Sequence, residues 1–138
     1  MGIVKIEDIE RIKESCLNSL NHLLNRIHEL NAFEFIALII ILSQYLYARY
    51  CKYGTRNKNA YEVYPKDIKS ALKDTEFGSY ARDIILLRNM ICHNYGSNTM
   101  LVKLHAAKKD KQTLCNFINY LIADKPSMLL AIEAMEGK

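Results

Sequence analysis

Arg88 and His93 are the residues in this sequence whose types best suit chemistry on a phosphate. Arginine carries a permanent charge and a forked set of donors that fits phosphate oxygens. Histidine has an ordinary pKa of about 6.5, so it can take or give a proton near neutral pH. Together they predict RNA cleavage by the neighbouring 2′-hydroxyl, with His93 moving the proton and Arg88 stabilising charge on the phosphate. This reaction requires no metal, and the sequence shows no acidic cluster for Mg²⁺, so we expect neither a metal site nor a cofactor.

The segment around this pair predicts a helix that is apolar on nearly every side. Its apolar run, residues 84–92, is interrupted by Arg88 and Asn89, and His93 and Asn94 follow. Burying an arginine is costly unless it has a partner or faces a wet cleft, so the charge needs an explanation. On an ideal helix Arg88 and His93 point about 140° apart. They could meet on one phosphate if the last turn bends, or if two copies of the chain face each other.

A purely structural explanation of the same residues is also open. Arg-x4-His is a short pattern that chance supplies often. A capped helix end with a buried, hydrogen-bonded histidine would account for His93, Asn94 and Gly96. The residue types alone do not separate this interpretation from a catalytic one.

Residues 88–95, Arg-Asn-Met-Ile-Cys-His-Asn-Tyr, resemble the Arg-Asn-x3-His-x-Tyr signature of the HEPN superfamily, and within it the HepT-type toxins. The resemblance implies a helical homodimer in which two copies of the motif form one RNA-cleaving site. Arg88 and His93 would be catalytic, with Asn89, Asn94 and Tyr95 supporting them. It also implies a partner, an MNT-type nucleotidyltransferase antitoxin, which in such systems adds AMP to the tyrosine that corresponds to Tyr95.

Two other functions remain as alternatives to a toxin ribonuclease. One is a non-catalytic HEPN domain that binds a nucleotide or a nucleotidyltransferase partner, and the other is a helical dimerisation scaffold. The intact pair favours the enzyme, because a binding domain needs no titrating histidine and a scaffold leaves Arg88 unexplained. The residue-level match covers 88–95 only, and the polar, basic segment 54–64 matches no family pattern.

The charge of the chain permits an RNA partner. The net charge is +4, a mild basic excess that by itself demonstrates nothing. Lys66, Lys69 and Lys73 recur on one side of a short predicted helix that Pro65 opens, and we take them as RNA-binding candidates. The competing interpretation of these lysines is an ordinary solvated helix face.

Hydrophobic periodicity predicts an all-α fold, an antiparallel helical bundle of four to five main helices in one domain over residues 1–138. A first helix over 4–30 pairs with a second that Asn31 and Glu34 cap and that ends before Gly54. The remaining helices follow the short one at Pro65. They are expected near residues 79–94, 114–122 and 126–135, with a basic run at 103–112.

The remaining features favour a cytoplasmic protein. The apolar run at residues 35–42 is shorter than the roughly 20 residues a membrane span needs, so it predicts a core segment. The N-terminus shows no signal-peptide pattern. The four cysteines are Cys16, Cys51, Cys92 and Cys115, each in an apolar stretch, and we expect them to be buried, reduced thiols.

Overall fold

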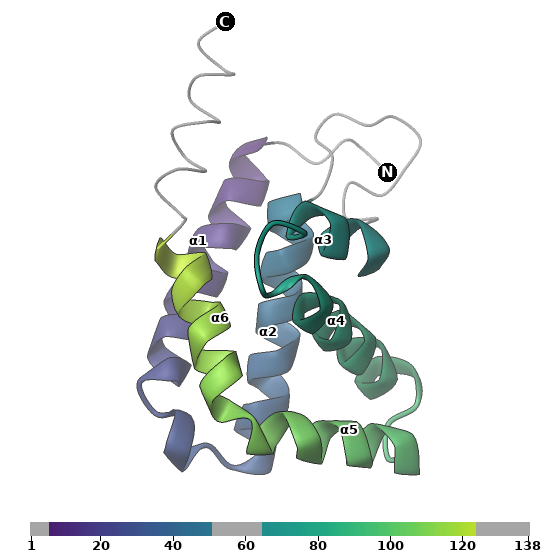
Figure 1. Cartoon of the computed structure of the whole chain (residues 1–138). Coiled ribbons are helices and arrows are strands. Elements are labelled where there is room, and N and C mark those ends of the chain that lie inside the picture. The colour runs from purple at the N-terminus through teal and green to yellow at the C-terminus, as the bar shows by residue number, and fades with distance from the viewer. Residues whose placement is uncertain (1–5, 51–64, 124–138) are drawn as a thin grey trace, which may run out of the picture.

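The computed structural model describes residues 6–50 and 65–123, and every regular element within these ranges is a helix (Figure 1). The elements are α1 (Ile6–Leu24), the 3-10 helix η1 (Ile27–Glu29), α2 (Ala32–Tyr50), α3 (Pro65–Ala71), α4 (Gly78–His93), α5 (Asn98–Lys109) and α6 (Lys111–Ala123). The predicted all-α bundle is confirmed, with α3 as its one short α-helix among these. Segment 54–64 and the helix expected at 126–135 lie outside the described residues.

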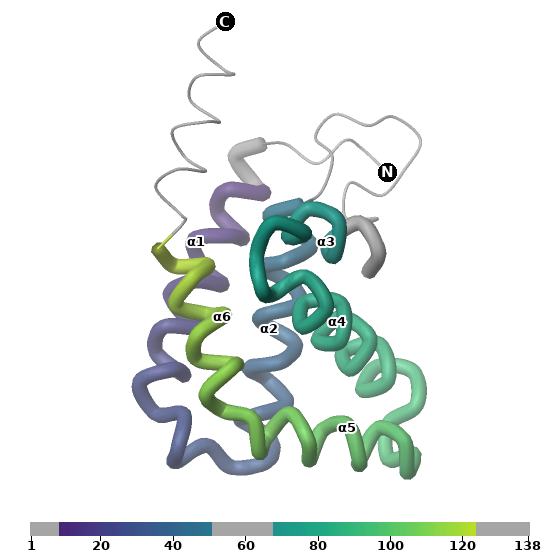
Figure 2. The backbone as a smooth tube through the Cα atoms, viewed as in Figure 1, coloured from purple at the N-terminus to yellow at the C-terminus, as the bar shows by residue number. Residues whose placement is uncertain are grey.

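The first two helices form an antiparallel hairpin, which the backbone tube shows clearly (Figure 2). The predicted capping box joins them. The backbone N–H of Asn31 donates to Glu34 Oε1 at 3.1 Å, and the N–H of Glu34 donates to Asn31 Oδ1 at 2.8 Å. Arg26 adds an ion pair to Glu34, with Nη1 and Oε2 3.0 Å apart. The bond from Asn31, followed by the Arg26 contacts, holds the pKa of Glu34 below its ordinary value.

The prediction of one helix over residues 4–30 is wrong at its C-terminal end, because α1 stops at Leu24. The hydrogen bonds then span three residues and no longer four: Arg26 N–H donates to the Leu23 carbonyl, and Glu29 N–H donates to the Arg26 carbonyl. This turn brings Ile27 into the core while the chain reverses into α2. The apolar pattern of the sequence continues through this turn because a 3-10 helix and an α-helix both place residues three apart on similar faces. The pattern therefore does not show where α1 ends.

The central helix of the bundle is α2, which contacts α1, α3 and α4. Half of the predicted core segment 35–42 is buried, whereas Ala37 and Ile40 are exposed. Within the described residues α2 is the single helix long and apolar enough to cross a membrane, and half of that stretch is buried inside the protein. A core helix of a bundle passes the same test of length and composition.

Aromatic packing on α6 fixes the N-terminal end of α4. The aromatic cluster comprises Phe77, Tyr80, Phe117 and Tyr120. Its ring centroids lie 5.2 to 5.6 Å apart, within the range of favourable aromatic pairs. On the other side of the same helix end, a Cβ on Gly78 would lie 3.1 Å from the backbone oxygen of Lys69, so α3 approaches closely only because this residue is glycine.

The sequence did not predict α5, which runs across one end of the bundle (Figure 1). Ser97 caps it, with its Oγ accepting from the N–H of Met100 at 3.2 Å. Met100 is also the one residue of α5 classed as buried. Asp110 then separates α5 from α6, and its Oδ1 accepts from the hydroxyl of Thr113 at 2.8 Å. The basic run at 103–112 is therefore folded into two helices.

The expectation of buried cysteines is wrong for the three that are described. Cys16 and Cys115 are half-buried and Cys92 is exposed, all as free thiols. Cys92 lies near the end of α4, beyond the part of the helix that neighbouring helices cover. Cys51 is outside the described residues.

Candidate functional site

Arg88 lies in the second half of α4, half-buried, and its side chain faces α2. Its Nη1 donates a hydrogen bond to Asn89 Oδ1 at 3.1 Å. The centre of its guanidinium group lies 5.7 Å from the ring centroid of Tyr47, within cation–π range. In the part of the chain that the structure describes, no carboxylate pairs with it. The guanidinium therefore contacts neutral groups, and no acidic side chain among the described residues neutralises its charge.

Tyr47 is a member of this site that sequence reasoning missed. It is half-buried near the C-terminal end of α2, and burial raises the pKa of its hydroxyl. The positive charge of Arg88 lowers the same pKa, so the guanidinium is close enough to interact electrostatically with the tyrosine. Tyr47 was a weak signal, because α2 contains two other tyrosines and the sequence does not identify a partner 41 positions further along the chain.

His93 is the last residue of α4, and its side chain is exposed. The helix stays regular to this point, since Asn94 N–H bonds to the carbonyl of Met90 at 2.8 Å. The last turn therefore does not bend to bring His93 toward Arg88, and the divergence of about 140° persists within one chain. Exposure also contradicts the structural alternative, a buried and hydrogen-bonded histidine.

The other motif residues lie around the end of α4. Asn89 is half-buried and holds Arg88, as described above. Asn94 is the C-cap residue and is exposed. Tyr95 is 65% exposed, and Gly96 follows it with a φ of 85°, the left-handed conformation expected of a glycine after a helix. The side chains at the C-terminal end of α4 are therefore exposed to solvent.

The predicted RNA-binding lysines lie at the other end of α4. Lys69 and Lys73 are exposed and line a pocket of about 500 Å³ together with Gly78, the first residue of α4. Arg88 is ten residues further along the helix, about 15 Å at 1.5 Å per residue, and His93 about 22 Å. The structure does not bring these lysines to the motif. The side chain of Lys66 lies outside the described part.

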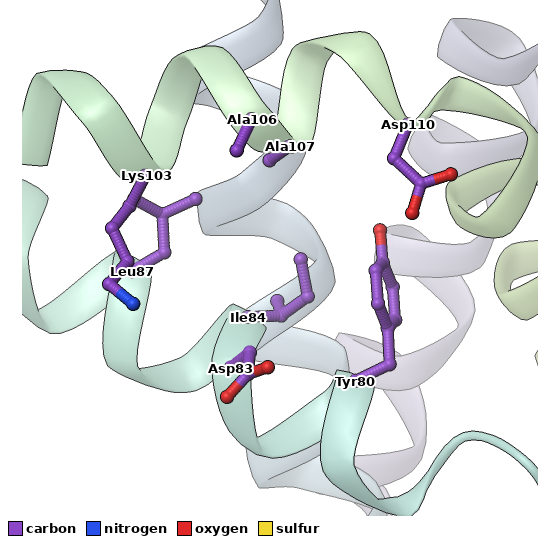
Figure 3. Close-up of a pocket in the computed structure, with 8 residues that line it drawn as sticks. All are labelled: Tyr80, Asp83, Ile84, Leu87, Lys103, Ala106, Ala107 and Asp110. Atoms are coloured by element: carbon purple, nitrogen blue, oxygen red, sulfur yellow. The ribbon is translucent and has the colours of Figure 1, made fainter.

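A second pocket, of about 260 Å³, lies between α4 and α5 (Figure 3). Neither Arg88 nor His93 lines it. The hydroxyl of Tyr80 points toward the carboxylate of Asp110 in this view, is buried, and has no hydrogen-bond partner among the described residues. Burial, and next the negative charge of Asp110, raises the pKa of Tyr80 well above its ordinary value. The described residues hold no group of three His, Cys, Asp or Glu side chains able to bind a metal ion.

Comparison of the chain with models of known families, with curated proteins and with solved structures gives no match. The local geometry of the site is therefore the basis for assigning a function.

Proposed function

We propose that the protein is a metal-independent endoribonuclease of the HEPN type that acts as a homodimer and serves as the toxin of a toxin–antitoxin pair. The observation that carries the proposal is the setting of Arg88. Its guanidinium is half-buried, positioned by Asn89 and Tyr47, and paired with no described acid. A positioned cation without a counter-charge is suited to a phosphate ligand.

The reaction is an internal transesterification. A histidine removes the proton of the 2′-hydroxyl, and the 2′-oxygen attacks the adjacent phosphorus. The bond to the 5′-oxygen breaks, and that oxygen takes up a proton as it leaves. Arg88 stabilises the negative charge on the phosphate oxygens during attack. The products are a 2′,3′-cyclic phosphate and a 5′-hydroxyl.

The divergence of Arg88 and His93 within one chain supports a site shared by two copies. The reaction needs one group to accept a proton and another to donate one, and the motif has one histidine per chain. A two-fold axis near the end of α4 would supply two histidines and two arginines around one phosphate. Leu86, on the outer side of α4, is 39% exposed and would add apolar contact area to such an interface.

The exposure of Tyr95 favours a modifying partner as well. Its side chain is accessible at the end of α4, as would be required for a nucleotidyltransferase to transfer AMP from ATP to its hydroxyl with release of pyrophosphate. Mass spectrometry after co-expression with a nucleotidyltransferase encoded beside it is the measurement. An unmodified Tyr95 in a fully inhibited complex would exclude this form of regulation.

The central experiment is cleavage of total RNA by the purified chain in excess EDTA, with analysis of the product ends. We expect activity and 2′,3′-cyclic phosphate termini. A strict requirement for Mg²⁺, or 5′-phosphate products, would contradict the mechanism. For the dimer, Arg88→Ala and His93→Ala chains are unfolded and refolded together, and recovery of some cleavage is expected. A monomer by light scattering that cleaves at the full rate would exclude the shared site.

A further inference from the structure

We propose that RNA binds along the outward face of α5, continuing from the motif, and that Lys69 of α3 and Lys73, just after this helix, are not the RNA-binding surface. This inference rests on the proposed ribonuclease function and assigns the substrate surface of the same site.

The first observation is the charge of the segment that forms α5 and the start of α6. Residues 98–112 include a single acid, Asp110, against four lysines, namely Lys103, Lys108, Lys109 and Lys111. The carboxylate of Asp110 is bonded to Thr113 and points toward Tyr80 (Figure 3). The lysines therefore give the segment a net positive charge, which attracts the phosphate backbone of a nucleic acid.

The second observation is that α5 contributes so little to the core. Met100 faces inward, whereas Leu101, Val102, His105 and Lys109 are all exposed. At 100° per residue, the last three share one side of the helix, opposite Met100. A surface with basic and apolar side chains side by side can contact both the phosphates and the bases of an unpaired strand.

The third observation is continuity with the motif. Tyr95 is separated from the first residue of α5 by two residues, Gly96 and Ser97, and both Tyr95 and α5 face solvent. An exposed tyrosine offers a ring on which an unpaired base can stack. A strand that reaches His93 and Tyr95 therefore continues directly onto α5.

Lys69 of α3 and Lys73, just after this helix, lack these properties. Residues 65–76 contain three lysines and three acids, Asp67, Asp74 and Glu76, so their charges cancel. Glu76 lines the same pocket as Lys69 and Lys73. This surface also lies about 15 Å along α4 from Arg88.

The experiment compares two single variants that each lose one positive charge. Lys109→Gln acts on the outward face of α5, and Lys69→Gln acts on α3, both in the full chain with His93→Ala to prevent cleavage. Binding to a fluorescent 20-nucleotide single-stranded RNA is measured from 50 to 300 mM salt. We expect the α5 variant to bind roughly fivefold more weakly at 100 mM, with a salt slope lower by about 0.7, the contribution of one phosphate contact. The α3 variant should bind as the parent does.

The possible outcomes distinguish failure of the proposed RNA-binding surface from failure of the proposed ribonuclease function. If the native chain neither cleaves nor binds RNA, the ribonuclease proposal fails and the surface fails with it. If the native chain cleaves RNA but the α5 variant binds as the parent does, the surface alone is wrong. If Val102→Ser instead changes the oligomeric mass and leaves RNA binding intact, the outward face of α5 is a protein interface, and the inference is again overturned.

Discussion

The two ends of α4 differ in what their side chains contact. At the N-terminal end the aromatic cluster and Gly78 lock the helix against α6 and α3. At the C-terminal end Arg88 rests on one tyrosine and one asparagine, while His93 and Tyr95 face solvent. One end therefore contributes to stability, and the other presents polar groups that the fold does not use. Substitutions at the two ends should separate activity from stability.

The largest effect is expected at the open end. His93→Ala should lower RNA cleavage by roughly 10²- to 10⁴-fold, the usual contribution of general acid–base catalysis, with little change in melting temperature because the side chain is exposed. His22→Ala, at an exposed histidine on α1, is the matched control and should cleave normally. Full activity in His93→Ala would show that the proposed site is wrong.

At the packed end, Phe117→Ala should lower the free energy of unfolding by about 3–5 kcal/mol, because it removes a fully buried ring from the aromatic cluster. Urea denaturation measures the loss. Asn119→Ala, two residues away and exposed, should change stability by less than about 0.5 kcal/mol. Equal effects of the two substitutions would mean that the cluster does not anchor α4.

Gly78→Ala should destabilise the same end by about 1–3 kcal/mol, as overpacking does. The added Cβ meets the backbone of α3 at 3.1 Å, and backbone atoms cannot move aside as a flexible side chain can. The control is Ser79→Ala at the exposed neighbour, which should be nearly neutral. A stabilised Gly78→Ala variant would show that α3 can shift at little cost.

Tyr47→Leu tests whether the aromatic ring positions Arg88. Loss of a cation–π contact of about 1 kcal/mol should reduce cleavage about fivefold. Tyr47→Phe keeps the ring and should restore the native rate, which a general loss of packing would not predict. If Tyr47→Phe and Tyr47→Leu are equally impaired, the hydroxyl or the packing matters and the ring does not.

The smallest effect concerns Tyr80 at alkaline pH. Because its pKa is raised on folding, the folded state holds this proton more tightly than the unfolded state does. Stability from this group is complete below about pH 10, the ordinary value for tyrosine, and is lost as pH rises above it. Tyr80→Phe also removes a buried hydroxyl that lacks a partner among the described residues, so it should be close to neutral at pH 7 and less sensitive to base. Parallel alkaline unfolding curves for the two proteins would contradict the role of this group.

Elements with strong periodicity or capping signals were predictable from the sequence. The capping box at Asn31 and Glu34 was found because it depends on residue types at a fixed spacing. In contrast, α5 was missed because Met100 is its one buried residue, and a helix that buries so little has no apolar stripe. The exposure of Cys92 was missed for a related reason, since periodicity does not show where neighbouring helices stop covering α4.

At the candidate site, the sequence predicts how side chains diverge along one helix but not which contacts they make with other helices. The spacing of Arg88 and His93 predicted their divergence on a helix, and the regular hydrogen bonding to the end of α4 agrees with it. The contact between Arg88 and Tyr47 depends on how α2 crosses α4, which no local pattern encodes. For the same reason, the placement of Lys69 and Lys73 away from the motif became visible only when α3 and α4 were packed together.

The capped hairpin of α1 and α2 has a consequence for the order of folding. Its two helices are joined by a short connection, so closing it costs little chain entropy, and we expect it to form early. The contact between Arg88 and Tyr47 can form only later, when α4 packs against α2. A nascent chain that has completed only its first 50 residues would contain the hairpin but not the proposed site, so RNA cleavage by that site would require most of the chain to have been synthesised.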